Sequence, residues 1–201
     1  MERGLLERRK HIVMSIVLSI LVPSIPSRFE KFQRIYQKLL DQSKGRDNIE
    51  ILGLFDNKQR SIGLKRDALV QMSKGDYVAF VDDDDNISPD YIVKLLQSAL
   101  SNPDVITFKQ TSIINGEQCT VDFDLTHTEN EGFTPGGTIK RRPFHVCAFK
   151  GEIARKYHFP DKMYGEDWGW CKQVLKDVKT QVKINEIIHI YVFDSEVTEA
   201  K

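Results

Sequence analysis

Apolar and polar positions follow two alternating patterns over the first hundred residues. Short apolar runs at residues 12–22, 49–55 and 76–82 are typical of buried strands. Between and after these runs, apolar residues recur every three or four positions, as they do in a helix that packs on one face. Strand and helix signals therefore alternate three times, and this order predicts a parallel, doubly wound sheet.

Polar residues before the helical stretches predict where the helices begin. Ser27 and Glu30 have the spacing of a capping box, and Ser61 is placed to cap the next helix. Ser88 followed by Pro89 predicts the start of a third helix.

The second half of the chain has a different pattern. Residues 105–124 predict a hairpin that turns at Asn115-Gly116. Two strands and an intervening helix are predicted further on, at residues 145–150, 165–177 and 182–193. No linker interrupts the pattern, so we expect a single domain over residues 1–201.

Composition narrows the class of protein. Lys plus Arg and Asp plus Glu each number 29 in 201 residues, so net charge gives no reason to expect general nucleic-acid binding. Three widely spaced cysteines without a CxxC motif predict reduced thiols, and therefore a cytoplasmic, reducing compartment. The apolar run at residues 12–22 is shorter than the roughly 20 residues that cross a bilayer, so we expect no transmembrane segment.

Four consecutive aspartates, Asp82 to Asp85, follow the third strand. In a doubly wound sheet, ligands gather at the carboxyl ends of the strands. If the chain stays extended, Asp82 and Asp84 face one way, as two oxygen ligands for Mg²⁺ or Mn²⁺. Arg28, Lys65 and Arg66 are candidate partners for a diphosphate. The alternative is a solvated acidic turn with ordinary surface cations nearby.

A second acidic group, Glu166-Asp167, opens a predicted helix, where the helix dipole favours negative charge. Capping explains one carboxylate. The presence of two, next to Trp168 and Trp170, predicts an acceptor site with aromatic faces that hold an apolar or sugar-like surface. His189 lies in an apolar strand, where a buried core histidine is the common case.

These segments together resemble the GT-A fold glycosyltransferases, most closely the family-2-like enzymes. The block "GDYVAFVDDDD…SPDYI" is specific to that family, and "GED" follows it at the family's distance. The resemblance runs from about Ser15 to Phe193. It implies an α/β, Rossmann-like fold of three layers, whose central sheet is mostly parallel with a small antiparallel extension. It also implies a nucleotide-sugar-binding half at about 15–110 and an acceptor-side half at about 111–193.

The resemblance implies a nucleotide-diphosphate sugar as donor, which we expect to be a UDP-sugar, and Mn²⁺ or Mg²⁺ as cofactor. Its implied metal ligands are Asp84, Asp82 and His189. The implied donor-binding residues are Pro23, Ser24, Arg28, Asp56, Lys65, Arg66, Asp82 and Asp83.

The resemblance also implies that Asp167 is the catalytic base of an inverting transfer, and that Glu166 orients acceptor or donor sugar. The acceptor would be a glycan or another hydroxyl compound, held by Trp168 and Trp170. The family's long C-terminal extension is missing, so a partner domain or a homo-oligomer is expected to help. The compact size suits a viral or phage enzyme.

Two other functions compete with glycosyl transfer. A nucleotidyltransferase usually has a glycine-rich phosphate loop after the first strand, which "VPSIPSR" lacks. A non-catalytic carbohydrate- or nucleotide-binding module leaves Glu166 and Asp167 without a role. Asn57 stands where the family commonly has an acidic residue after the second strand, a departure that concerns base recognition by Asp56.

Overall fold

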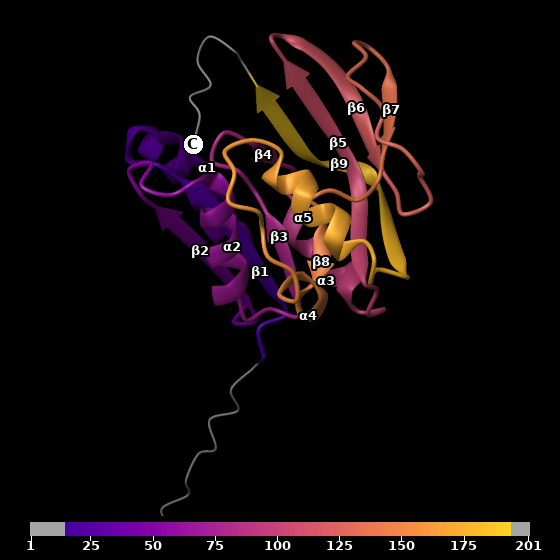
Figure 1. Ribbon diagram of the computed structural model, residues 1–201. Helices are drawn as coiled ribbons and strands as arrows, with labels where there is room; N and C mark the ends of the chain where they lie inside the picture. Colours follow the sequence, from indigo (N-terminus) through magenta and orange to yellow (C-terminus); the bar gives the residue numbers. More distant parts are fainter. Residues whose placement is uncertain (1–14, 194–201) are drawn as a thin grey trace, which may run out of the picture.

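The computed structural model describes residues 15–193 (Figure 1). The strands in this part of the chain are β1 (Leu18–Ser24), β2 (Ile49–Phe55), β3 (Tyr77–Phe80), β4 (Asn86–Ile87), β5 (Val105–Ile114), β6 (Glu117–Phe123), β7 (Thr138–Arg141), β8 (Ala148–Lys150) and β9 (Gln181–Phe193). The helices are the 3-10 helix η1 (Pro26–Arg28), followed by α1 (Phe29–Ser43), α2 (Ile62–Met72), α3 (Tyr91–Ala99), α4 (Gly151–Ala154) and α5 (Glu166–Val174).

These strands form one sheet with the order β2-β1-β3-β8-β5-β6-β7, and β9 pairs with both β5 and β4. The first three strands pair in parallel, as the alternation of strand and helix predicts. Antiparallel pairing begins at β8, which lies between β3 and β5. β9 runs parallel to β5 along its length, and its residues His189 and Ile190 also pair with the short strand β4.

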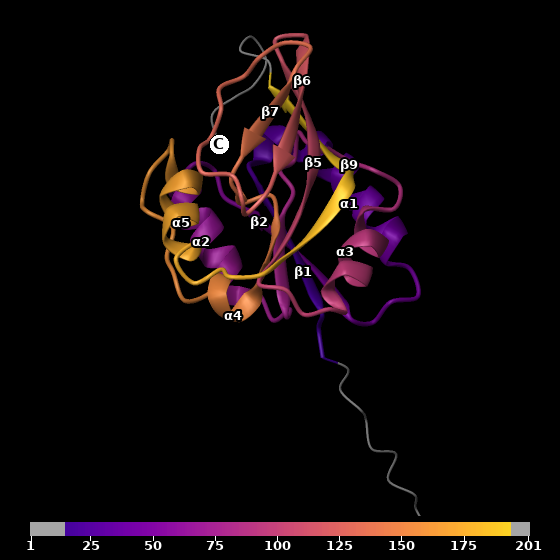
Figure 2. The ribbon, with the colours of Figure 1, turned by 90° about the vertical axis from the view of Figure 1, so that its right-hand side faces the viewer.

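Helices cover both faces of the sheet. Seen along the sheet, α2, α4 and α5 lie on one face, and α1 and α3 lie on the other (Figure 2). This is the three-layer α/β arrangement that the sequence predicts. The carboxyl ends of β1, β2 and β3 meet at one edge, and α5 lies on the same face of the sheet as α2, which it contacts.

β1 and β3 have continuous apolar sequences because both faces of these strands are buried. Every residue of β1 and of β3 is buried, since helices cover the sheet on both sides. The three cysteines, Cys119, Cys147 and Cys171, are also buried, as free thiols. In the described part of the chain, no helix is long and apolar enough to span a membrane.

The predicted helix starts have different outcomes. Ser61 caps α2 as predicted, with its hydroxyl accepting a bond of 3.1 Å from the backbone N–H of Leu64. The capping box at Ser27 is wrong, because residues 26–28 form η1 and α1 begins at Phe29 without a side-chain cap. The start at Ser88 is also wrong, by two residues, since Asp90 is the N-cap of α3.

The hairpin between β5 and β6 is confirmed. Asn115 and Gly116 both have positive φ, at 50° and 83°, as a two-residue turn of this kind requires.

Gly63 fixes α2 against the segment that precedes α5. Its N–H donates to the carbonyl of Lys162 at 3.1 Å, and a Cβ here would lie 2.0 Å from the carbonyl oxygen of Pro160. We therefore predict that Gly63→Ala lowers the free energy of unfolding by about 1–3 kcal/mol, because overpacking forces the two segments apart. Urea denaturation measures this.

Gly132→Ala is the control, since nothing lies within 4 Å of a Cβ at that position. If the two variants unfold at the same urea concentration, the close packing of α2 on this segment does not contribute to stability.

Candidate functional site

The four aspartates lie where β3 ends, at the edge that holds the carboxyl ends of β1 and β2. They form a tight turn, in which the N–H of Asp85 donates to the carbonyl of Asp82 at 3.1 Å. The chain is therefore not extended here. The side chains nevertheless alternate as predicted, since Asp82 and Asp84 are partly exposed while Asp83 and Asp85 are buried. The turn directs the aspartates towards three different partners.

Arg28 is the cation that faces the middle of this turn. One of its terminal nitrogens lies 2.6 Å from Asp83 and also contacts Asp84. The hydroxyl of Ser24 donates to the other oxygen of Asp83 at 2.7 Å. Because Asp83 is fully buried, these partners hold the turn in place, and Ser24 supports the site from within β1. Its neighbour Pro23 is a buried residue of the same strand.

Arg66 on α2 joins the two acidic groups of the chain. Its guanidinium lies 2.9 Å from Asp82 and 3.3 Å from Glu166, 100 residues further along the chain. Burial alone would lower the pKa of Arg66, but the charges of Asp82 and Glu166 raise it above its ordinary value. The two acidic groups that the sequence singles out therefore meet at one place, and Arg66 connects them.

Asp85 and His189 form a buried pair beneath the turn. His189 Nε2 lies 3.2 Å from Asp85 Oδ2, and the exposed fractions are 0% and 1%. Burial raises the pKa of Asp85, and His189 partly offsets this rise. His189 also stacks on Phe108. It therefore contacts the acidic turn from the core side.

The predicted metal ligands fit a divalent cation only in part. Carboxylate oxygens are suitable ligands, and the side chains of Asp82 and Asp84 remain 14% and 13% exposed. However, residues 15–193 contain no group of three or more His, Cys, Asp or Glu side chains arranged around an ion. The three-residue set with His189 is therefore not assembled. The arrangement fits a cation held by two carboxylates, with phosphates and water completing its shell.

Asp56 and Lys65 lie deeper than the sequence suggests. Lys65 is fully buried, 2.8 Å from Asp56 and 3.0 Å from the carbonyl of Ser24. Arg60 approaches the other oxygen of Asp56 at 3.0 Å. Lys65 therefore ties the ends of β1 and β2 together, and it is not exposed to a diphosphate.

Glu166 and Asp167 face different parts of the site. Glu166 is buried against Arg66, and burial raises its pKa while Arg66 counters the rise. Asp167 is 26% exposed in its side chain, and Oδ1 accepts the N–H of Trp168 at 2.6 Å. Asp167 is thus the more accessible of the two carboxylates.

His145 is a site residue that the sequence did not single out. Its Nδ1 lies 3.7 Å from Oδ2 of Asp167, too far for a hydrogen bond. Burial, and then the charge of Arg66, lower the pKa of His145 from 6.5 to about 3, so the ring is neutral near pH 7. No local pattern in "HVCAFK" marks this contact, because it forms only when β8 and α5 come together.

The two tryptophans have different environments. Trp168 is partly buried and stacks on Phe144, with ring centroids 5.9 Å apart. Trp170 is 1% exposed, stacks on Phe159 and donates from Nε1 to the carbonyl of Tyr157 at 3.2 Å. Trp170 is therefore a core residue and offers no surface to an acceptor, which corrects the prediction for that position.

A pocket of about 270 Å³ lies beside the acidic turn, and Asp167 and His145 are among the residues that line it.

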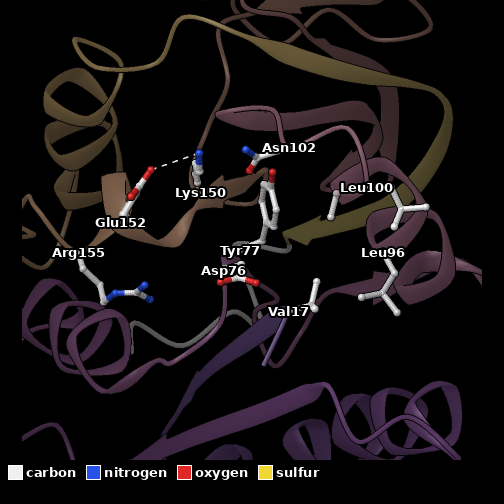
Figure 3. Close-up of a pocket in the computed structure, with 10 residues that line it drawn as sticks. Val17, Asp76, Tyr77, Leu96, Leu100, Asn102, Lys150, Glu152 and Arg155 are labelled. Carbon is white, nitrogen blue, oxygen red and sulfur yellow. Dashed lines mark ion pairs between the residues drawn. The ribbon is translucent and has the colours of Figure 1, made fainter. Parts of the chain in front are cut away.

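Another pocket, of about 460 Å³, lies at the opposite edge of the sheet (Figure 3). Its lining includes Val17 and Asp76, which precede β1 and β3, together with Lys150, whose amino group pairs with Glu152 at 3.2 Å. That edge holds the amino ends of the strands, away from the acidic turn.

Solved structures with a similar fold include three of the S. aureus protein TarS. TarS 1-349 in complex with UDP-GlcNAc has a TM-score of 0.65 and 12% identity, covering 92% of this chain and 60% of that one. TarS 1-349 in complex with UDP has a TM-score of 0.63 and 12% identity, covering 88% and 60%. A longer TarS structure has a TM-score of 0.61 and 11% identity, covering 88% and 36%.

The chain thus spans about 60% of the TarS 1-349 chain, and at this identity the likeness concerns the fold. Comparison with curated protein sequences gives no match. The family model described as "Glycosyl transferase family 2" matches residues 30–156, which include the acidic turn, Arg66 and His145. The fold class and the family that the sequence predicts are therefore confirmed: this chain belongs to glycosyl transferase family 2.

Proposed function

We propose that the protein transfers a sugar from a nucleoside-diphosphate sugar to an acceptor hydroxyl, with inversion at the anomeric carbon. The observation that carries this proposal is the bridge from Asp82 through Arg66 to Glu166. It brings the acidic turn, suited to a donor, next to Asp167, which opens towards a pocket suited to an acceptor.

A UDP-sugar is the donor that we propose. Two TarS structures of the same fold contain UDP-GlcNAc and UDP, which supports this choice. The nucleotide would lie over the carboxyl ends of β1 and β2, near Asp56 and Arg60, with its diphosphate towards the acidic turn. Asp82 and Asp84 would hold a Mn²⁺ or Mg²⁺ ion, which when bound offsets the charge on the leaving diphosphate.

Asp167 is the group best placed to act as the base. It accepts the proton of the acceptor hydroxyl while that oxygen attacks the anomeric carbon, and the bond from this carbon to the diphosphate breaks. Its position at the start of α5 favours the negative charge that a base needs. Glu166 remains paired with Arg66 and is proposed to orient the donor sugar. Trp168, stacked on Phe144, forms part of the acceptor side.

The first prediction tests the reaction class. With Mn²⁺ or Mg²⁺, and with water as a slow acceptor, the protein should release UDP from at least one of UDP-glucose, UDP-galactose and UDP-GlcNAc. A coupled assay for UDP measures this, with heat-denatured protein as the control. A binding module would bind the donors and release nothing. A nucleotidyltransferase would instead release pyrophosphate from UTP in the presence of a sugar phosphate.

The second prediction concerns the base. Asp167→Asn keeps the side chain's shape and its bond with Trp168 but removes the proton acceptor. We expect transfer to fall by about 10²–10⁴-fold while the affinity for UDP stays the same. The product's anomeric proton, observed by NMR, should show inverted configuration in the unaltered protein.

Asp161→Asn is the matched control, because Asp161 is an exposed aspartate in the segment that precedes α5. Retained configuration, or near-normal transfer by Asp167→Asn, would show that Asp167 is not the base.

The third prediction concerns the cation. Asp84→Asn should weaken the binding of UDP in the presence of Mn²⁺ by about tenfold or more, because an amide is a poorer ligand for a hard cation than a carboxylate. Binding of UDP without metal should change less. Calorimetry with and without Mn²⁺ measures both affinities.

Asp90→Asn serves as the control, since Asp90 follows the turn and pairs with Lys94 outside the site. If Mn²⁺ raises the affinity of the Asp84→Asn variant for UDP as much as that of the unaltered protein, Asp84 is not a metal ligand.

A further inference from the structure

The pocket beside Asp167 has features that describe its ligand. It measures about 270 Å³, below the roughly 300–1,000 Å³ of pockets for drug-sized ligands, and suits a single ring. It opens between the start of α5 and the strands β5 and β7. Two aromatic side chains, Phe133 and Phe144, line one wall of the pocket, and Phe144 stacks on Trp168.

Two buried polar side chains that line this pocket each have one atom without a hydrogen-bond partner in the described part of the chain. Gln110 and His145 are 6% and 8% exposed. Among the described residues, no group hydrogen-bonds to Gln110 Oε1 or to His145 Nδ1. The amide nitrogen of Gln110 is already engaged, since it donates to Ser112 at 2.8 Å. A buried polar atom without a partner is unfavourable, and a ligand with hydroxyl groups would offset part of this penalty.

Arg141 adds positive charge to the same pocket. Its Nε donates to the carbonyl of Glu131 at 3.1 Å, which fixes the side chain to the loop that precedes β7. It forms no ion pair with any carboxylate of residues 15–193. An arginine that lines a pocket and has no acidic partner is well suited to a phosphate or carboxylate, which it binds through two parallel hydrogen bonds.

We propose that this pocket is the acceptor subsite and takes a sugar ring that carries an anionic group. The aromatic wall packs on the ring, Gln110 and His145 hydrogen-bond to its hydroxyls, and Arg141 binds the anion. One hydroxyl then lies at Asp167, which lines the same pocket. This inference rests on the proposed glycosyl transfer, because it assigns the acceptor of that reaction.

Three matched sugars test the charge preference: methyl β-glucoside, its 6-phosphate and methyl β-glucuronide. Their affinities are measured by titration of the tryptophan fluorescence in the presence of UDP and Mn²⁺, because Trp168 stacks on the pocket residue Phe144. We expect at least one anionic sugar to bind about tenfold more tightly than the neutral one. The phosphate and the carboxylate are compared directly, which identifies the preferred anion.

Arg141→Gln should remove this preference and leave the affinity for the neutral sugar unchanged. Arg141→Lys, which keeps the charge but not the fork of donors, should retain part of it. Arg142→Gln is the matched control, because Arg142 is the next residue and does not line the pocket. Thermal unfolding of each variant establishes that it is folded.

The outcomes separate this inference from the proposed function. If UDP-sugars are hydrolysed but the three sugars bind equally, or Arg141→Gln keeps the preference, the anionic acceptor is excluded and glycosyl transfer stands. If no UDP-sugar is bound or hydrolysed, the proposed function fails, and the acceptor assignment fails with it.

Discussion

The structure of this site depends on the compensation of charge around four adjacent carboxylates. Like charges this close would repel one another, and the turn is stable because each carboxylate faces a positively charged or hydrogen-bonding partner. Arg28 holds Asp83 and Asp84, and Arg66 holds Asp82. These cations come from two different helical segments, so the loops after β1, β2 and β3 are held together by the acidic turn. Removing either arginine would leave a buried charge uncompensated, which costs more than the ion pair contributes.

The same requirement joins the two halves of the chain. Arg66 pairs with both Asp82 and Glu166, and its contact with Glu166 fixes the start of α5 beside the acidic turn. The close approach of α2 at Gly63 to the segment before α5 leaves no room for a shift between them. As a result, Asp167 has a defined position relative to the acidic turn, although the two are far apart in the sequence. A displacement transfer needs such fixed positions, because acceptor and donor must meet in line.

Much of this arrangement follows from local sequence. The strand and helix order, the cap at Ser61 and the carboxylates at the end of β3 all depend on neighbouring residues, so pattern and spacing were enough to predict them. What could not be predicted depends on tertiary packing. Trp170 and Trp168 are two positions apart in one motif, and only the packing of α5 decides which of them is buried. Likewise, nothing in the sequence around His145 indicates that Asp167 lies beside it.

The carboxylates of the acidic turn already face partners within the protein, which gives a bound cation a role at this edge. Asp82, Asp83 and Asp84 are matched by two arginines, and Asp85 faces His189 in the core. Lys65, a further cation near this edge, is buried against Asp56 and is not exposed to a ligand. A diphosphate that arrives at this edge therefore meets carboxylates whose protein partners are already engaged. In the proposed reaction, a divalent ion shared between Asp84 and the phosphates would offset the added negative charge of the diphosphate.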